Sequence, residues 1–203
     1  MLKFYVFLIF SLLPCTMLNA AGPTASGSSQ LGLSLQYRNV GGDFYASGGR
    51  LNQFTSTGSY GYFLFDGLML KGNGVFSIIE TGPVTFTRYG LGPGLYYFFG
   101  GTGPEKVKGK ILPYVGIDSI LTVGKAANKV LVQTSSGLVS GLSTRKTYNL
   151  DLAAKAGLTF MLSEQVGVFL EAGFEMVFFL EANSPYGLNG NAITSNMGLV
   201  FFL

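Results

Sequence analysis

The stretch YNLDLAAKAGLTFMLSEQVGVFLEAGFEMVFFLE, residues 148–181, decides the fold class. Apolar side chains fill nearly every even position of 148–162 and of 166–181. The odd positions include the polar residues Asn149, Asp151, Lys155, Thr159, Glu171, Glu175 and Glu181. Alternation with a period of two predicts strands with one apolar face, whereas a helix would scatter the even residues around its surface. The stretch therefore predicts two antiparallel strands joined by the short turn 163–165.

Six further segments show the same alternation and predict six more strands. Their ranges are about 31–38, 54–65, 68–79, 84–99, 110–124 and 192–203. Asp66-Gly67 is a tight-turn signal, whereas 39–53 and 125–146 are long connectors. Within the second of these, 130–132 and 138–139 are expected to extend a hairpin beyond the membrane. Eight is an even strand number, as bacterial single-chain barrels require, and short turns face the periplasm in such barrels. We therefore expect both termini in the periplasm.

The composition favours a membrane barrel over a soluble one. The chain is 48% hydrophobic and only 11% charged, and it holds 30 Gly, 18 Phe and 11 Tyr. Soluble domains average about 25% charged residues. Beyond the N-terminal segment, no run reaches the roughly 18 apolar residues of a spanning helix, and a closed barrel is the other structure that satisfies its backbone in lipid. We expect an all-β fold: an eight-stranded antiparallel up-and-down transmembrane β-barrel over 31–203.

The N-terminus has the features of a bacterial export signal. Lys3 supplies a positive charge, 4–13 form an apolar segment, and Leu18-Asn19-Ala20 fits a cleavage site. We expect 1–20 to be a signal peptide and 21–30 to be a polar linker before the barrel. The predicted destination is the bacterial outer membrane.

Two residue types bound the chemistry of the exported chain. Cys15, the single cysteine, would leave with the signal peptide, which excludes disulfides and thiolate metal ligands. Lipidation of Cys15 is the alternative, although Pro14 stands where a lipobox carries a small residue. The chain has no histidine, the commonest general base and metal ligand. We expect no catalytic residue, cofactor or metal, and without a basic run we expect no nucleic acid as partner.

The polar face of the predicted strands carries charges of both signs. In a membrane barrel this face lines the lumen, where opposite charges must pair to offset the cost of burial. An eight-stranded barrel is just wide enough for its own side chains to fill, so we expect a charge-paired, largely closed lumen. Lys155 is expected to pair with Glu171 or Glu175, and Arg88 with Asp118. The complete predicted set is Arg38, Lys71, Arg88, Asp118, Asp151, Lys155, Glu171 and Glu175.

Two further patterns are better explained by structure than by chemistry. Gly90-Leu91-Gly92-Pro93-Gly94 lacks the helix and the Lys-Ser/Thr ending of a phosphate loop, and its glycines suit a narrow lumen. Glu171 and Glu175 would stand about 13 Å apart on a strand, too far for a glycosidase pair.

Five segments together resemble the small outer-membrane β-barrel superfamily, which includes the transmembrane domain of outer membrane protein A. They are GYFLFDGLML (61–70), YGLGPGLYYFF (89–99), PYVGI (113–117), AGLTFML (156–162) and NMGLVFFL (196–203). The ending is also similar to the barrel-assembly signal: Met197, Leu199, Phe201 and Leu203 keep its alternation, with Leu in place of the usual terminal Phe. The resemblance implies outer-membrane lipid and the barrel-assembly machinery as partners, and leaves any surface ligand unidentified.

The architecture also looks like that of the lipid A deacylase family. Asn183, Pro185, Gly187 and Asn189 loosely resemble an Asn-Pro-Gly-x-Asn stretch of that family. Its activity uses a His-Ser pair and a Glu, and this chain has no histidine, so the shared scaffold does not transfer the activity. The leading hypothesis is a non-enzymatic barrel with a structural or surface-interaction role. A narrow pore for small solutes and a histidine-independent lipid-modifying enzyme remain as alternatives.

Overall fold

The computed structural model describes residues 22–40, 51–81, 84–103, 105–134, 137–180 and 190–203; within these strands the side chains of 37–40, 51–52, 81, 84, 126–134, 137–145, 179 and 190–192 lie outside the description. The predicted signal peptide with Cys15, and Asn183, Pro185, Gly187 and Asn189, lie outside the described residues. Within the described ranges, no helix has the length and apolar character to cross a membrane.

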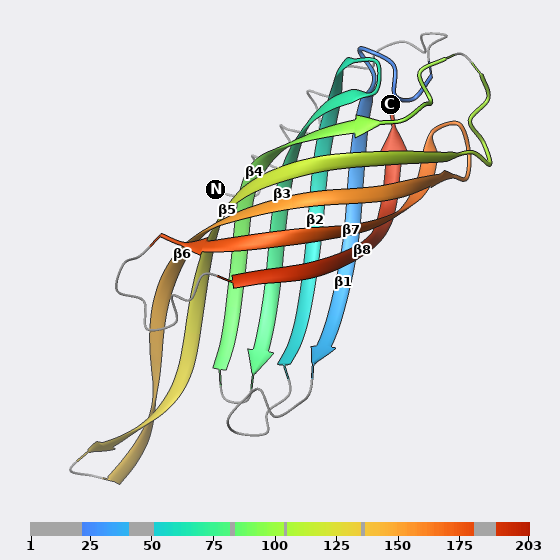
Figure 1. Ribbon diagram of the computed structural model, residues 1–203. Coiled ribbons are helices and arrows are strands. Elements are labelled where there is room, and N and C mark those ends of the chain that lie inside the picture. The colour runs from blue at the N-terminus through green and yellow to red at the C-terminus, as the bar shows by residue number, and fades with distance from the viewer. Residues whose placement is uncertain (1–21, 41–50, 82–83, 104, 135–136, 181–189) are drawn as a thin grey trace, which may run out of the picture.

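Eight antiparallel strands form a closed barrel in chain order, with the last strand paired back to the first (Figure 1). They are β1 (Ser29–Val40), β2 (Leu51–Phe65), β3 (Leu68–Thr81), β4 (Val84–Phe98), β5 (Ile111–Thr134), β6 (Gly137–Met161), β7 (Val166–Phe179) and β8 (Gly190–Phe202). The predicted number, order and antiparallel pairing of the strands are confirmed, because each sequence-derived range falls on one of these strands.

One predicted connector is wrong in extent. Residues 125–146 form the outer parts of β5 and β6 rather than a loop, with register pairs from Lys125↔Lys146 to Thr134↔Gly137. The apolar pairs expected at 130–132 and 138–139 continue the ladder, so the chain has no reason to leave the strand conformation earlier. The resulting hairpin projects beyond the other strands at what we call the loop end of the barrel (Figure 1). The opposite end, where the 66–67 turn and the β1 start lie, is the turn end.

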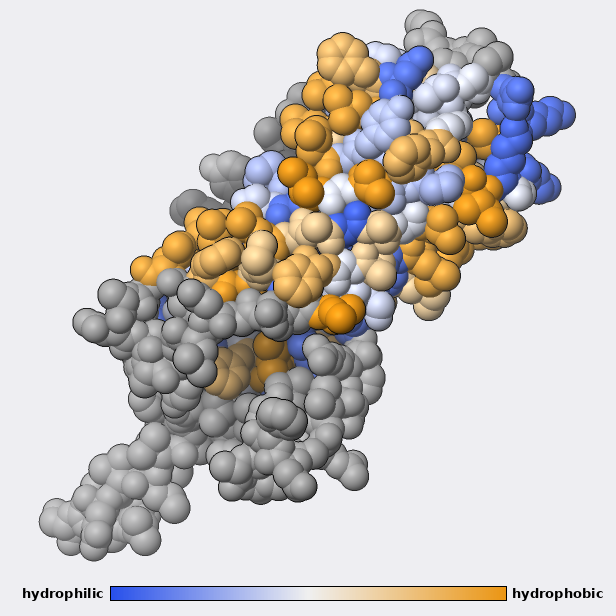
Figure 2. Space-filling model, in the orientation of Figure 1, coloured by the Kyte–Doolittle hydropathy of each residue, from blue (hydrophilic) through white to orange (hydrophobic). Residues whose placement is uncertain are grey.

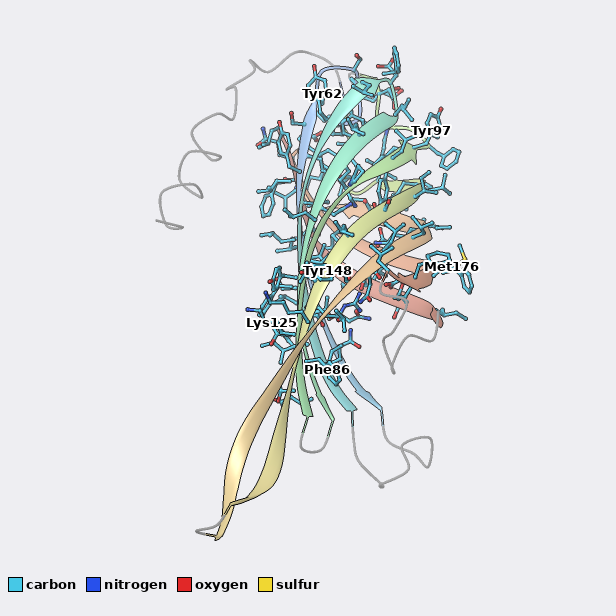
Figure 3. The ribbon with its side chains drawn as sticks, turned by 90° about the vertical axis from the view of Figure 1, so that its left-hand side faces the viewer. Tyr62, Phe86, Tyr97, Lys125, Tyr148 and Met176 are labelled. Carbon is cyan, nitrogen blue, oxygen red and sulfur yellow. The ribbon has the colours of Figure 1, made fainter. Side chains whose placement is uncertain are left out.

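The outer surface is apolar, as the alternation predicts. Exposed fractions are large even for aliphatic side chains, for example 74% for Leu91, 57% for Leu170 and 82% for Ile193. Apolar side chains predominate on the described face drawn in Figure 2. Tyr62 and Tyr97 lie toward the turn end and Tyr148 toward the loop end (Figure 3). An apolar band with aromatic residues near both edges is the outer surface of a barrel that faces lipid.

The segment expected to be a polar linker lies across the turn end. Thr24 is fully buried; its backbone N–H donates to the Gly101 carbonyl (3.2 Å), and its carbonyl accepts from the Gly67 N–H (2.9 Å). Its hydroxyl donates to the Gly100 carbonyl at 2.6 Å. Gly67 has a φ of +78°, the left-handed conformation that the tight 66–67 turn requires and glycine allows. The segment therefore joins the β2–β3 turn to the β4–β5 connector.

Candidate functional site in the lumen

The turn end of the lumen is filled by apolar side chains. Phe63 and Met161 are fully buried and Phe98 is 2% exposed. The Phe63 and Phe98 rings meet edge to face with centroids 5.6 Å apart, and the Phe98 and Phe202 rings do so at 6.4 Å. We call this set the apolar plug: Phe63, Met69, Phe98, Val107, Leu112, Met161, Val200 and Phe202.

An ionic layer lies on the loop side of the apolar plug. Its centre is Lys155 of β6, whose ammonium is 2.9 Å from Asp118 Oδ2 and 3.0 Å from Glu171 Oε1. The two carboxylate side chains are 1% and 5% exposed. Tyr96 donates to Asp118 Oδ2 at 2.7 Å, and Tyr114 donates to Glu171 Oε2 at 3.2 Å. The layer thus ties β4, β5, β6 and β7 together across the lumen.

Amide and cationic side chains complete this layer. Asn73 donates from Nδ2 to Asp118 Oδ1 at 2.8 Å, and Asn196 donates to Glu171 Oε1 at 3.4 Å. Lys71 Nζ lies 3.8 Å from the centroid of the Tyr96 ring, a distance at which a cation is attracted to the aromatic face. Charge-assisted hydrogen bonds of this kind are stronger than neutral ones, so the layer is both dense and rigid.

Arg88 pairs with Asp151, at 2.6 Å, and donates to Thr122 at 3.1 Å. The predicted pair of Arg88 with Asp118 is therefore wrong. Arg88 lies opposite Gly124 whereas Asp118 lies opposite Gly94, six residues along β4, which is about 20 Å. The strands can be predicted from the sequence, but the register that separates Arg88 from Asp118 along the barrel cannot.

The structure places the other predicted lumen residues as follows. Lys155 meets Glu171, one of the two expected partners, and also Asp118. Glu175 lines the cavity on the loop side. Arg38 belongs to β1, opposite Gln53, but its side chain lies outside the described residues.

A cavity of about 220 Å³ occupies the loop half of the lumen. Its lining is mainly polar and includes Gln36, Gln53, Thr55, Ser77, Arg88, Asp151 and Glu175. Near the turn end, by contrast, the space between the plug and the ionic layer amounts to about 30 Å³, which is room for about two waters. The lumen is therefore a polar cavity in its loop half, and side chains fill its base at the turn end.

The described lumen offers little for catalysis. No group of three or more carboxylate, thiol or imidazole side chains could hold a metal ion among the described residues. The carboxylates of the ionic layer already accept hydrogen bonds from lysine, tyrosine and asparagine. Their geometry suits mutual charge compensation.

Sequence reasoning did not identify the apolar plug. The signal that could have identified it is a run of consecutive apolar residues at a strand end, where the apolar–polar alternation is lost, such as Tyr96-Tyr97-Phe98-Phe99. Tyr97 and Phe99 are 45% and 54% exposed, whereas Tyr96 and Phe98 are buried. A strand end with apolar residues on both faces therefore predicts an aromatic rim outside and a plug inside.

Comparisons with known proteins find similar solved structures but no family for this chain. No protein-family model matches the chain, and no curated protein matches it. Solved structures similar to it include OprG from Pseudomonas aeruginosa, Neisserial surface protein A, and Ail, the attachment invasion locus protein of Yersinia pestis. Identities are 10%, 16% and 14%, and TM-scores 0.49, 0.48 and 0.48. Each match covers 88% of this chain and 97%, 97% and 99% of the solved chains.

The class of the fold follows from the chain's own geometry. The strands close into a barrel, with β8 paired back to β1 over 198–202 and 30–34, the outer surface is apolar, and the polar residues face inward. A soluble barrel would have the opposite arrangement. With its antiparallel strands closed on themselves, a lipid-type surface and a polar lumen, the chain is an eight-stranded transmembrane β-barrel.

Proposed function

We propose that this chain is a non-enzymatic outer-membrane barrel whose lumen is closed by charge pairing, with a structural or surface-interaction role. The observation that carries the proposal is the filled base of the lumen. The apolar plug and the ionic layer lie one behind the other, and both consist of side chains of the barrel itself, all from the strands except Val107 of the β4–β5 connector. A solute would have to displace buried aromatic rings and a doubly paired lysine to pass.

The proposal also covers the membrane in which the barrel lies and its export to that membrane. The exposed apolar band fits outer-membrane lipid, with the turn end toward the periplasm. Met197, Leu199 and Leu203 face outward, with exposed fractions of 60%, 44% and 50%, and Phe201 shares their face. This is the pattern expected of a strand presented to the barrel-assembly machinery. Cleavage near Ala20 remains part of the proposal, and N-terminal sequencing of the extracted protein should begin at Ala21 or Gly22.

A non-enzymatic role is supported by the residue inventory. The chain has no histidine, and the lumen carboxylates Asp118, Asp151 and Glu171 are engaged with cations and hydroxyl groups. A lipid-modifying reaction needs an activated nucleophile beside a base. Mass spectrometry of lipid A after expression of this chain should therefore show an unchanged lipid.

Planar-bilayer recording of the refolded protein tests closure directly. We expect no steady open conductance, and we expect none after Glu171→Gln, which weakens one lysine contact but leaves the apolar plug. Glu175→Gln, which changes a cavity residue, is the matched control. Glu171→Gln should lower the unfolding midpoint and Glu175→Gln should lower it less. A steady open conductance of the unmutated barrel would refute closure.

The second candidate function is a narrow pore for small solutes. The observation that favours it is the polar cavity of about 220 Å³, which would serve as a vestibule. Passage would also require the Lys155 pairs to open. The bilayer recording separates the two functions, because a vestibule with a filled base carries no current.

A further inference from the structure

We propose that Lys125 and Lys146 form a binding site for the phosphate group of a bilayer lipid, on the outer wall of the barrel near its loop end. The inference goes beyond the proposed function, because it concerns the outer surface and holds whether or not the lumen conducts. Neither residue belongs to the lumen set.

The first argument is the register of the two lysines. Lys125 of β5 lies directly opposite Lys146 of β6, and both side chains are exposed. Side chains in this relation have Cβ atoms about 4.5–5.5 Å apart, and like charges there destabilise a sheet. An anion held between the two ammonium groups would replace repulsion with two charge-assisted hydrogen bonds, and a phosphate has the oxygens to accept both.

The second argument is depth relative to the membrane. Two residues closer to the turn end on each strand, Tyr89, Val123 and Tyr148 form a row across β4, β5 and β6. The two tyrosines are 45% and 41% exposed, as expected of residues at a membrane–water interface. Figure 3 shows Lys125 at the outer surface beside Tyr148, where the hairpin leaves the barrel. The lysines therefore lie at headgroup level.

The third argument is the surface beneath the lysines. Leu121 and Leu91 lie opposite each other one further row toward the turn end, with exposed fractions of 51% and 74%. A lipid whose phosphate lies between the lysines would lay its acyl chains on this apolar strip. Charge above and an apolar strip below match the two parts of one lipid molecule, which a free phosphate ion does not have.

The outward carboxylate of β3 is too distant to neutralise this pair. Glu80 lies opposite Thr85, whereas Lys125 lies opposite Thr87. Two strand spacings and two residues separate Glu80 from Lys125, about 12 Å between Cα atoms. That separation exceeds the Debye length of about 8 Å at physiological ionic strength. The described surface thus leaves the lysine pair with an excess of positive charge.

The test compares retention of lipid A by the barrel in detergent, measured by native mass spectrometry. The probes are lipid A with both phosphates and the same lipid A dephosphorylated. The variant is Lys125→Gln/Lys146→Gln. The matched control is Lys106→Gln/Lys108→Gln, which removes two exposed lysines from the β4–β5 connector at the turn end. Heat-modifiable gel migration confirms that each variant has folded.

We expect the unmutated barrel to retain the phosphorylated lipid and not its dephosphorylated form. The Lys125/Lys146 variant should bind about 30-fold more weakly, since each lysine near an anionic surface contributes roughly a factor of five. The control should bind normally. Equal binding by both variants, or equal binding of both lipids, would overturn the site. Competition by inorganic phosphate as strong as that by lipid A would overturn the lipid as its ligand.

Discussion

The two halves of the lumen share the same strands but are filled in opposite ways. In the turn half, Phe98 and Leu112 are 2% and 3% exposed, and both belong to the apolar plug. In the loop half, the same β4 carries Arg88 beside a cavity of about 220 Å³ lined largely by hydroxyl and amide groups. The β3–β4 ladder is continuous through both halves, and the β4–β5 ladder is interrupted only at Gly92 and Pro93. Side-chain volume, rather than strand geometry, therefore decides where the barrel is closed.

The two ion-pair groups of the lumen also differ in how far their side chains are exposed to solvent. Lys155 is enclosed by two carboxylates whose side chains are 1% and 5% exposed. Arg88, with a side chain 24% exposed, pairs with Asp151 at the cavity. Removing the cation from two nearly buried carboxylates leaves two uncompensated charges, whereas solvent around a more exposed side chain compensates part of the loss. The stability of the barrel should therefore depend more on the turn half than on the loop half.

The largest expected effect comes from Lys155→Met. It leaves Asp118 and Glu171 without their shared cation, and we expect a loss of about 3–5 kcal/mol in the free energy of unfolding. Arg88→Met should cost less, roughly 1–2 kcal/mol, because it removes one carboxylate contact rather than two, and the Arg88 side chain is 24% exposed against 15% for Lys155. Urea titration in vesicles measures both, followed by circular dichroism because the chain contains no tryptophan. Equal losses would erase the distinction between the two halves.

A second test uses two phenylalanines on the same face of β4. Phe98→Ala removes a ring from the apolar plug and should cost about 3 kcal/mol. Phe86, toward the loop end (Figure 3), is only partly buried, so Phe86→Ala should cost about 1 kcal/mol. The ratio of the two losses in the same urea titration is the relevant quantity. A larger loss at Phe86 would mean that the loop half, rather than the turn half, holds the stabilising core.

The strands could be predicted from sequence because their alternation is local. In β6 and β7 each lumen residue is separated from the next by one apolar residue that faces lipid, and the structure keeps that order. The outer part of the β5–β6 hairpin was expected to be a connector, in which only 130–132 and 138–139 would extend the hairpin, because its composition resembles that of a polar loop. Pairing continues there to Thr134↔Gly137, since cross-strand pairs rather than composition maintain a ladder.

The lumen was only partly predictable for a geometric reason. Lys155 and Glu171 lie on strands that are consecutive in sequence, and the short 163–165 turn fixes their relative position. Arg88 and Asp151 lie on strands separated by β5, so their contact depends on two registers at once. The apolar plug combines side chains from the ends of six strands and from the β4–β5 connector, which no single segment of sequence reveals.

Alanine substitutions at two glycines should change the stability of the barrel by smaller amounts. A Cβ on Gly116 would stand 2.5–2.7 Å from atoms of the Tyr96 ring, which is held in the ionic layer by Asp118. Gly116→Ala should therefore cost about 1–3 kcal/mol. At Gly72 a Cβ would have the Tyr60 carbonyl 3.9 Å away as its nearest neighbour. Gly72→Ala should change stability by less than about 0.5 kcal/mol, and a similar loss at both sites would show that Tyr96 is free to move.

The smallest effect is expected from an ion pair that is shorter than either contact of Lys155. Lys110 Nζ lies 2.6 Å from Glu105 Oε2 in the β4–β5 connector, with side chains 47% and 80% exposed. The hydrogen bond from Lys110 lowers the pKa of Glu105. A lowered pKa in the folded state stabilises it above the ordinary pKa of the carboxyl, and that contribution is lost as the pH falls. Water around the pair screens it, so Glu105→Gln should leave the urea midpoint unchanged at neutral pH and at pH values below the ordinary glutamate range. A loss approaching that of Lys155→Met would mean that the distance between charges governs their contribution; the contrast expected here assigns that control to burial.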